Sequence, residues 1–149
     1  MDKIDRAILS HLQKDGRMSN TQLASAVGLS ESACLRRVKK LVDDGVITHF
    51  SAQINAARVG LGSSVFVRVS LERQTEDQLR LFETAVKKVP EVMECFLMGG
   101  DVDYLMRIAV KDTSDYERVH HVLTNLPGVM RVHSGFALRT VLKRPRLPL

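Results

Sequence analysis

Four basic residues lie close together between Ser30 and Gly45, in the sequence SESACLRRVKKLVDDG. Guanidinium and ammonium groups bind phosphate, and arginine can also donate two hydrogen bonds to the edge of a guanine base. A helix that carries such a cluster is therefore suited to lie in the major groove of double-stranded DNA. An ordinary surface helix with a solvated basic face is the alternative for this segment taken alone. The basic residues are Arg36, Arg37, Lys39 and Lys40.

The same segment carries the signals of a helix with defined ends. Ser30 is a good N-cap, because its hydroxyl can accept hydrogen bonds from the free backbone N–H groups of the first turn, and Glu31 places negative charge where the helix dipole favours it. Gly45 can end the helix in the left-handed conformation. Apolar residues recur at spacings of three and four and are expected to face a core. They are Ala33 or Cys34, Leu35, Val38, Leu41 and Val42.

The elements around this helix predict the fold that positions it. A first amphipathic helix is expected up to the turn at 14–17, and a second begins at Ser19. Gly28 supplies the short turn before the third helix, as in a helix-turn-helix. The β-branched, roughly alternating residues 46–54 predict a short strand pair, or wing. We therefore predict a winged helix-turn-helix domain over residues 1–54.

Within this domain we assign base reading to Arg36 and Arg37, and contact with the DNA backbone to Lys40. Lys39 adds positive charge beside them. Polar side chains near the starts of the second and third helices can add phosphate or base contacts. Solvation is the alternative for each residue taken singly. These polar residues are Asn20, Ser30 and Ser32.

The chain after residue 62 changes its pattern. Residues 55–62 form the predicted linker, and the following segments alternate between strand and helix periodicity. Their order, βαββαβ, predicts a ferredoxin-like domain over residues 63–149, in which two helices cover one face of an antiparallel sheet. The fold class of the whole chain is thus α+β. The predicted strands are 64–71, 92–98, 104–110 and 129–141, and the predicted helices open at 75 and at 112 or 113.

The second face of this sheet is not covered by the two helices. The first strand nevertheless carries apolar residues on both of its sides, at Val65, Phe66, Val67 and Val69. We expect a second copy of the chain to cover this face, because twofold pairing is the commonest way to bury a self-complementary surface. A dimer would also present two recognition helices to DNA half-sites.

Composition limits the remaining classes of protein. The chain has 149 residues, of which 44% are hydrophobic and 26% charged, and this balance is typical of a globular protein. No apolar run is long enough to cross a bilayer, and the N-terminus lacks a signal or transit pattern, so we expect a cytoplasmic protein without a membrane partner. The net charge of +5 agrees with a polyanionic partner. The basic C-terminal tail can skirt DNA or can simply be solvated.

The sequence carries no pattern of an enzyme. It lacks a Cys–His pair, paired carboxylates, a phosphate-binding loop and zinc-ligand spacing. The five histidines are scattered, and the adjacent pair His120 and His121 would point in different directions on a helix. Cys34 and Cys95 fall inside predicted elements and are expected to be buried small hydrophobes. We expect no catalysis, no cofactor and no metal.

In order along nearly the whole chain, the residues resemble the leucine-responsive/asparagine-responsive regulator family (Lrp/AsnC, the feast/famine regulators). The matching segments are 2–5 with 8–9 and 12–17; 23–24 with 27–30; 34–38 with Leu41 and 45–47; 100–101 with 103–105; and 126–129.

This resemblance implies a bacterial or archaeal transcription regulator whose C-terminal domain senses amino acids or related metabolites. It also implies dimers that associate further, commonly into an octamer. The effector pocket of the family lies where dimers meet, around the turn that joins the second and third strands. Carried over, the pocket residues are Met98, Gly99, Gly100, Asp101, Asp103, Tyr104, Thr113, Phe136, Ala137 and Leu138.

The chemistry of these residues fits an amino acid. Backbone N–H groups at Gly99 and Gly100 can hold a carboxylate, and Asp101 or Asp103 can pair with an α-ammonium group. A plain β-turn between hairpin strands is the alternative for this segment. The family commonly has a Pro where this chain has Ala33, so the base preference of the family's recognition helix does not carry over to this chain. Residues 136–138 vary across the family, which leaves the ligand undefined.

The sequence thus predicts a homo-oligomeric DNA-binding regulator that responds to an amino acid. A nucleoid-associated architectural protein without an effector response is the alternative, and it shares the same basic surface.

Overall fold

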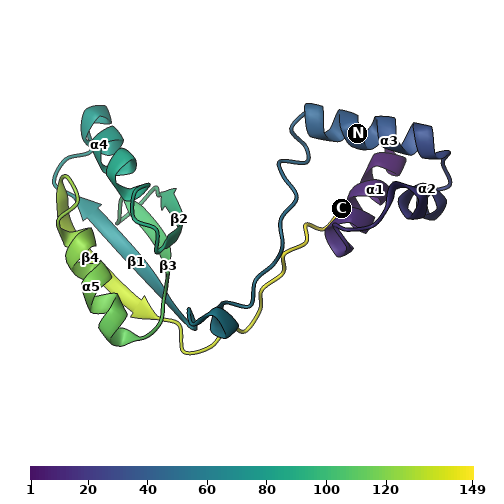
Figure 1. Cartoon of the computed structure of the whole chain (residues 1–149). Coiled ribbons are helices and arrows are strands. Elements are labelled where there is room, and N and C mark those ends of the chain that lie inside the picture. The colour runs from purple at the N-terminus through teal and green to yellow at the C-terminus, as the bar shows by residue number, and fades with distance from the viewer. The chain divides into compact units, whose positions relative to one another are not determined.

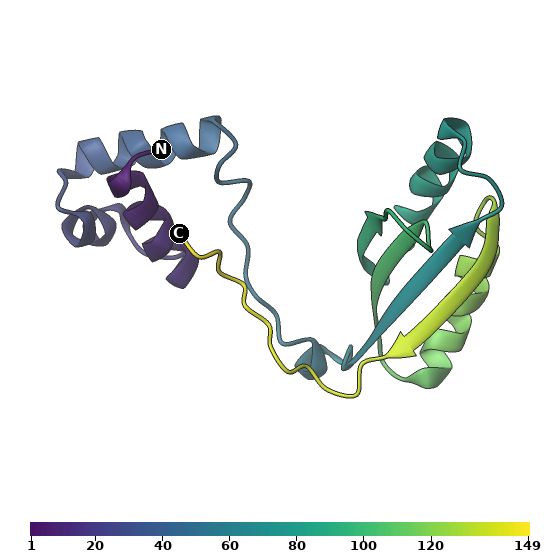
Figure 2. The same cartoon turned by 180° about the vertical axis from the view of Figure 1, so that it is seen from behind.

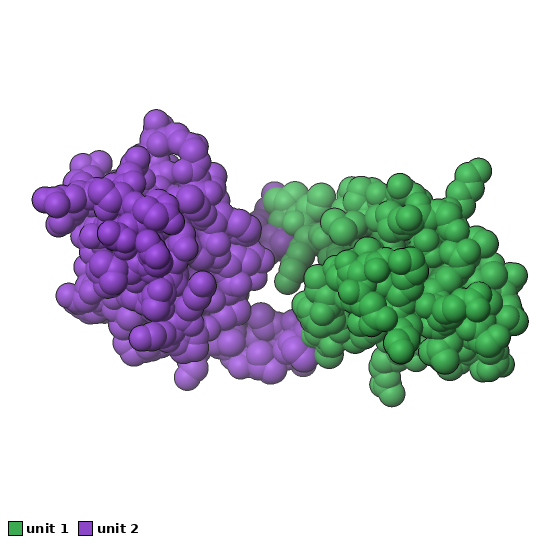
Figure 3. Space-filling view, turned by 90° about the horizontal axis from the view of Figure 1, so that it is seen from above, with its two compact units in different colours: residues 1–53, 141–149 green, residues 54–140 purple.

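The structure, a computed structural model, describes all 149 residues of the chain. They form two compact units, residues 1–53 with 141–149, and residues 54–140 (Figure 3). We call them the helical unit and the sheet unit. Residues 141–149 group with the helical unit, whereas the sequence placed them in the second domain. The domain and linker boundaries given above stay predictions.

The helical unit contains the three helices expected from the sequence (Figure 1). Each begins at a capping side chain, Asp2, Ser19 or Ser30, that accepts a hydrogen bond from a backbone N–H group of the first turn. Gly28 has a φ of 68° and ends the second helix in the left-handed conformation, which costs glycine little. The helices are α1 (Lys3–Lys14), α2 (Asn20–Val27) and α3 (Glu31–Asp43).

The core of the helical unit is small, and α3 gives it only a narrow stripe. Cys34 and Leu41 are its two buried residues, seven positions apart. The expectation that Leu35 and Val42 also face the core is wrong, since they are 59% and 42% exposed. Two neighbouring helices cannot cover the wider apolar stripe that the spacing predicted. The buried core consists of Ile8, Leu9, Leu23, Ala24, Cys34 and Leu41.

The expected strand pair over residues 46–54 is absent. The only regular element between α3 and the first strand is the short 3₁₀ helix η1 (Ala56–Val59). A strand needs a partner, and an isolated two-stranded pair is marginal in water. The tail instead meets α1, where the Leu147 backbone N–H donates to Gln13 Oε1 at 2.6 Å.

The sheet unit has the predicted ferredoxin-like order βαββαβ, which confirms the α+β fold class. Its strands are antiparallel and follow the spatial order β2-β3-β1-β4, with α4 and α5 on the same face of the sheet (Figures 1 and 2). The last strand ends at Phe136, which pairs with Val65, rather than at 141, because its partner β1 begins only two residues before Val65, at Ser63. The elements are β1 (Ser63–Leu71), α4 (Glu76–Val86), β2 (Val92–Leu97), β3 (Tyr104–Val110), α5 (Thr113–Thr124) and β4 (Val129–Phe136).

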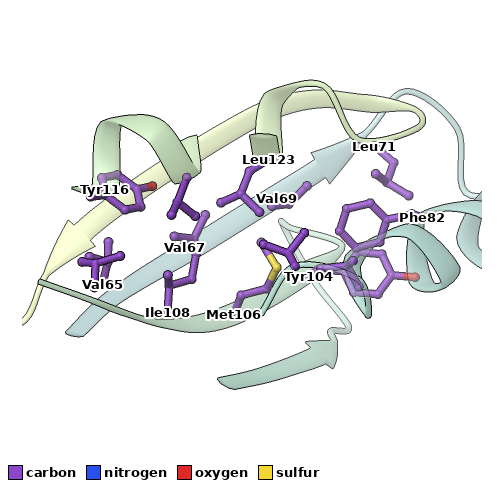
Figure 4. Packing of buried hydrophobic residues seen from close by; sticks show 14 residues of the cluster. Val65, Val67, Val69, Leu71, Phe82, Tyr104, Met106, Ile108, Tyr116 and Leu123 are labelled. Atoms are coloured by element: carbon purple, nitrogen blue, oxygen red, sulfur yellow. The ribbon is translucent and has the colours of Figure 1, made fainter. Parts of the chain in front are cut away.

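The main core lies between the two helices and the sheet (Figure 4). Val65, Val67 and Val69 alternate into it from β1 and are fully buried. The rings of Phe82 and Tyr104 pack with their centroids 4.4 Å apart. This core makes β1 and β3 rigid supports for the loops at their ends.

The other face of the sheet carries no helix (Figure 2). Phe66 and Phe96 lie on it and are 45% and 53% exposed. Arg107 also lies there, beside Phe66 in the β1–β3 register, and pairs with Glu94 at 3.0 Å. We call this surface the open face.

Candidate nucleic-acid interface and effector region

The turn between α2 and α3 is fixed by its own polar groups. The Asn20 side-chain amide donates to the Glu31 carbonyl oxygen at 2.9 Å, which ties the start of α2 to the start of α3. The Ser30 hydroxyl accepts from the Ala33 backbone N–H at 3.3 Å and contacts the Ser32 hydroxyl at the same distance. Asn20 and Ser30 therefore hold the turn that presents α3.

One face of α3 is uncovered and polar. Ser32, Arg36 and Lys39 recur at helical spacing, and all three are exposed. No ion pair engages Arg36 or Lys39, so both cations are available to a ligand. Lys40 lies beside this face and forms an exposed pair with Asp44, Nζ to Oδ2 at 2.8 Å. Exposed pairs of this kind are weak and can exchange for phosphate.

Arg37 is placed differently from Arg36. Its Nη1 lies 2.8 Å from a carboxylate oxygen of Asp2 and 2.8 Å from one of Asp5, so the guanidinium joins α3 to the start of α1. The pKa of both carboxyl groups is lowered, first because each accepts the other's backbone N–H and then because of the Arg37 guanidinium. Base reading by Arg37, predicted from the sequence, would require it to leave these partners.

The predicted effector residues separate into two groups within one chain. The first lies on the β2–β3 hairpin, where the Met98 backbone N–H donates to the Asp103 carbonyl at 2.8 Å. Gly99 and Gly100 have open space where a side chain would stand, and Gly100 has a φ of 124°, which favours glycine. Met98 and Asp101 are exposed, so the hairpin tip offers backbone N–H groups and one free carboxylate.

Asp103 and Tyr104 belong to the interior. Asp103 is 7% exposed, and its carboxylate accepts from the Leu71 backbone N–H at 2.7 Å and from the Gln74 amide at 2.6 Å. The Tyr104 hydroxyl donates to Glu83 at 3.0 Å. Burial, and then this bond, raise the pKa of Tyr104 far above its usual range. Both side chains thus fix the hairpin to α4 and to the end of β1.

The second group lies at the opposite end of β1. Phe136 is paired with Val65, near the start of β1, whereas Tyr104 is paired with Val69. The Ala137 backbone N–H donates to the Ser64 carbonyl at 3.0 Å, and Leu138 is almost fully exposed. Thr113 opens α5 close to the end of β3 at Val110, which pairs with Ser63. One chain therefore does not bring the ten predicted residues together.

Sequence reasoning missed the partners that hold these side chains. Asp2 and Asp5 form a capping box, and their spacing of three before an apolar run was the available signal. Gln74 and Glu83 carry no comparable signal, because their contacts depend on tertiary packing.

A helix-turn-helix with an uncovered basic face, joined to a ferredoxin-like unit, defines a two-domain DNA-binding regulator. Residues 1–48 match the model of a winged helix-turn-helix DNA-binding domain, and residues 64–147 match that of the Lrp/AsnC ligand binding domain. The chain belongs to the Lrp/AsnC family of transcriptional regulators and is not an enzyme. None of its helices combines the length and the apolar character that crossing a bilayer requires.

Individual relatives agree with this assignment. The chain is 44% identical over 150 residues to the Bkd operon transcriptional regulator of Pseudomonas aeruginosa, covering 100% of this chain and 98% of the relative. It is 40% identical over 148 residues to the leucine-responsive regulatory protein of Escherichia coli, covering 99% and 90%. A transcriptional regulator of Neisseria meningitidis, solved in complex with L-methionine, superposes with a TM-score of 0.93 at 37% identity, covering 99% and 96%.

Proposed function

We propose that the chain is a cytoplasmic, sequence-specific regulator that reads double-stranded DNA with the exposed face of α3 and binds an amino acid, or a related metabolite, between copies of its sheet unit. One observation carries the first part: Ser32, Arg36 and Lys39 are uncovered together on a helix whose other side is packed. A helix in the major groove needs such a face, because donors must reach base edges while cations neutralise nearby phosphates.

Arg36 has the leading role in this proposal, since its guanidinium is unpaired and suits a guanine edge. Lys39 and Lys40 supply charge toward the backbone, and Asn20, Ser30 and Ser32 lie at the helix starts, where phosphate contacts gather. Arg37 keeps the base-reading role predicted from the sequence only if DNA displaces its two carboxylate partners.

The DNA part is tested by selecting an operator from a random duplex pool and measuring affinity. With about 1 to 3 kcal/mol per good base contact, the double variant Arg36→Ala and Lys39→Ala should bind at least tenfold more weakly and with a shallower salt dependence. The double variant Lys87→Ala and Lys88→Ala removes the same charge from two exposed residues just after α4 and should bind normally. Normal binding by the α3 variant would refute the assignment.

The separation of the effector residues supports a site shared between copies. A pocket that contains both the hairpin tip and the end of β4 requires a second chain, because the two groups stand at opposite ends of β1. In this pocket Gly99 and Gly100 would hold the carboxylate and Asp101 the α-ammonium group. Met98, Thr113 and Phe136 would then select the side chain. The regulator of Neisseria meningitidis solved with L-methionine supports an amino-acid ligand.

We further propose a homodimer formed through the open face, which assembles to an octamer. Phe66 and Phe96 give this face its exposed apolar surface. Sedimentation and operator affinity, each with and without a panel that includes L-methionine and L-leucine, test assembly and coupling together. Binding of an amino acid that shifts either quantity supports the proposal. No shift with any ligand favours an architectural DNA-binding protein without an effector.

A further inference from the structure

Leu35 is a large, exposed apolar side chain in the N-terminal half of α3. It is 59% exposed, although the sequence pattern placed it in the core. At about 100° per residue, it lies within about 60° of Ser32 and Lys39 around the helix axis. Leu35 therefore borders the face that carries the free cations.

The buried core of the helical unit does not include this side chain. This core takes Cys34 and Leu41 from α3, on the other side of the helix. Leu35 lines a shallow hollow of about 250 Å³ on the surface, together with Val38, Phe50 and other residues. An isolated exposed leucine needs no explanation by itself, so its position on the helix must carry the argument.

That position matches one feature of the major groove. Base edges there present hydrogen-bond donors and acceptors and a single apolar group, the 5-methyl of thymine. Arg36 and Lys39 can satisfy acceptors and phosphates, but they gain nothing from a methyl group. An apolar side chain near the N-terminal end of a recognition helix can, because residues in this part approach the bases.

We propose that Leu35 reads the 5-methyl group of a thymine, so that it is a specificity-determining residue of the DNA-binding surface. The inference rests on the proposed function, because it requires α3 to enter the major groove. It adds an apolar contact, which acts by exclusion of water, to the electrostatic contacts already assigned.

The test replaces single thymines of the selected operator with deoxyuridine, which removes only the methyl group. A substitution in one half-site should weaken wild-type binding about fourfold, the value of one buried methyl-sized group, and substitutions in both half-sites should weaken it about 16-fold. The penalty should be nearly independent of salt, whereas the Arg36→Ala penalty should fall as salt rises.

Leu35→Ala should bind the thymine and the deoxyuridine operators equally, and Leu35→Met, which conserves volume, should keep the discrimination. Val42→Ala is the matched control, since Val42 is also exposed and lies two turns further along the same line of α3. It should discriminate as the wild type does. Circular dichroism checks that each variant is folded.

Three results would overturn the inference. In the first, removal of any single thymine methyl group leaves wild-type binding unchanged. In the second, the Leu35→Ala variant still binds the thymine operator more tightly than the deoxyuridine operator. In the third, Leu35→Ala changes the sedimentation of the protein, which would make the hollow a contact between copies. Failure of the proposed function looks different, because then no operator is selected at all.

Discussion

The helical unit and the sheet unit hold their candidate sites in opposite ways. In the helical unit Ser32, Arg36 and Lys39 come from a single helix, so one chain presents the whole surface. In the sheet unit the hairpin tip and the end of β4 are separated by most of the length of β1. A DNA surface that is complete in one chain and an effector site that needs two would make effector binding inseparable from assembly. Through assembly the effector can then set the spacing of the reading helices.

The two units also differ in what their polar residues do. The cations on the exposed face of α3 are free for a ligand, whereas the polar atoms of Asp103 and Tyr104 form hydrogen bonds within the sheet unit. Free charges are suited to a large anion that arrives from solvent. Buried, satisfied groups are suited to fixing a loop, which leaves ligand contacts to the exposed tip beside them.

The largest effect is expected from a substitution that prevents assembly. Phe66→Lys places a cation on the open face, beside Arg107, and should convert the proposed dimer into a monomer. Because two linked reading helices bind far more tightly than one, operator affinity should fall about 10² to 10⁴-fold. Sedimentation and operator titration measure both effects.

Leu81→Lys is the control for this substitution. Leu81 is 57% exposed on α4, away from the open face, so the charged variant should remain dimeric. A Phe66→Lys protein that sediments as the wild type would show that copies of the chain do not assemble through the open face.

A second substitution separates positioning from ligand binding at Asp103. Asp103→Ala leaves the Leu71 N–H and the Gln74 amide unpaired and should lower the free energy of unfolding of the sheet unit by about 1 to 3 kcal/mol. Asp103→Asn should retain most of this stability, because its oxygen can accept from Leu71 and Gln74 can turn its amide to accept in return. Both tyrosines lie in the sheet unit and the chain has no tryptophan, so tyrosine fluorescence in urea reports this unit selectively.

The same pair of variants tests the effector contact. If Asp103 only positions the hairpin, the Asn variant keeps its affinity for the amino acid despite the lost charge, and this is the result we expect. Loss of affinity in a stable Asn variant would show that the charge itself pairs with the α-ammonium group.

The predictions from sequence succeeded where the signal was local. The cap at Ser30, the turn at Gly28 and the strand and helix periods are set by neighbouring residues, and the structure confirms the three helices and the βαββαβ order. The wing over 46–54 failed because a strand also needs a partner, which periodicity cannot supply.

The candidate sites show the same limit. Helical spacing separated charged from apolar residues on α3, but it could not show that only Cys34 and Leu41 would be fully buried, or that Leu35 would stay exposed. The engagement of Arg37 by Asp2 and Asp5 spans more than thirty positions and depends on how α1 crosses α3. The burial of Asp103 is likewise a tertiary property.

A smaller effect is expected from the cap that starts the reading helix. Ser30→Ala removes the acceptor of the Ala33 N–H and should cost about 1 kcal/mol of helical-unit stability. Circular dichroism in urea should detect it, while the tyrosine signal of the sheet unit stays unchanged. Ser30→Asp restores the acceptor and should recover the stability, yet its charge beside the DNA surface should weaken operator binding. A cap loss that shifts the tyrosine transition instead would show that the two units do not unfold separately.

The smallest expected effect is on the pH dependence of stability, and it distinguishes Arg37 from its neighbour Arg36 on α3. The lowered pKa values of Asp2 and Asp5 mean that their stabilising contribution is present above the ordinary value of 3.8 and is lost as the pH falls through the lowered values. Arg37→Gln removes part of the cause. The variant should therefore be less stable than the wild type near pH 7, and the difference should shrink toward zero as acid protonates both carboxyl groups. Arg36→Gln should behave in the opposite manner, with weak operator binding and no such pH-dependent difference, because Arg36 has no carboxylate partner. Urea unfolding across this pH range and operator titration of both variants measure the contrast. An Arg37→Gln variant with wild-type acid behaviour and the larger loss of DNA affinity would reverse the roles of the two arginines.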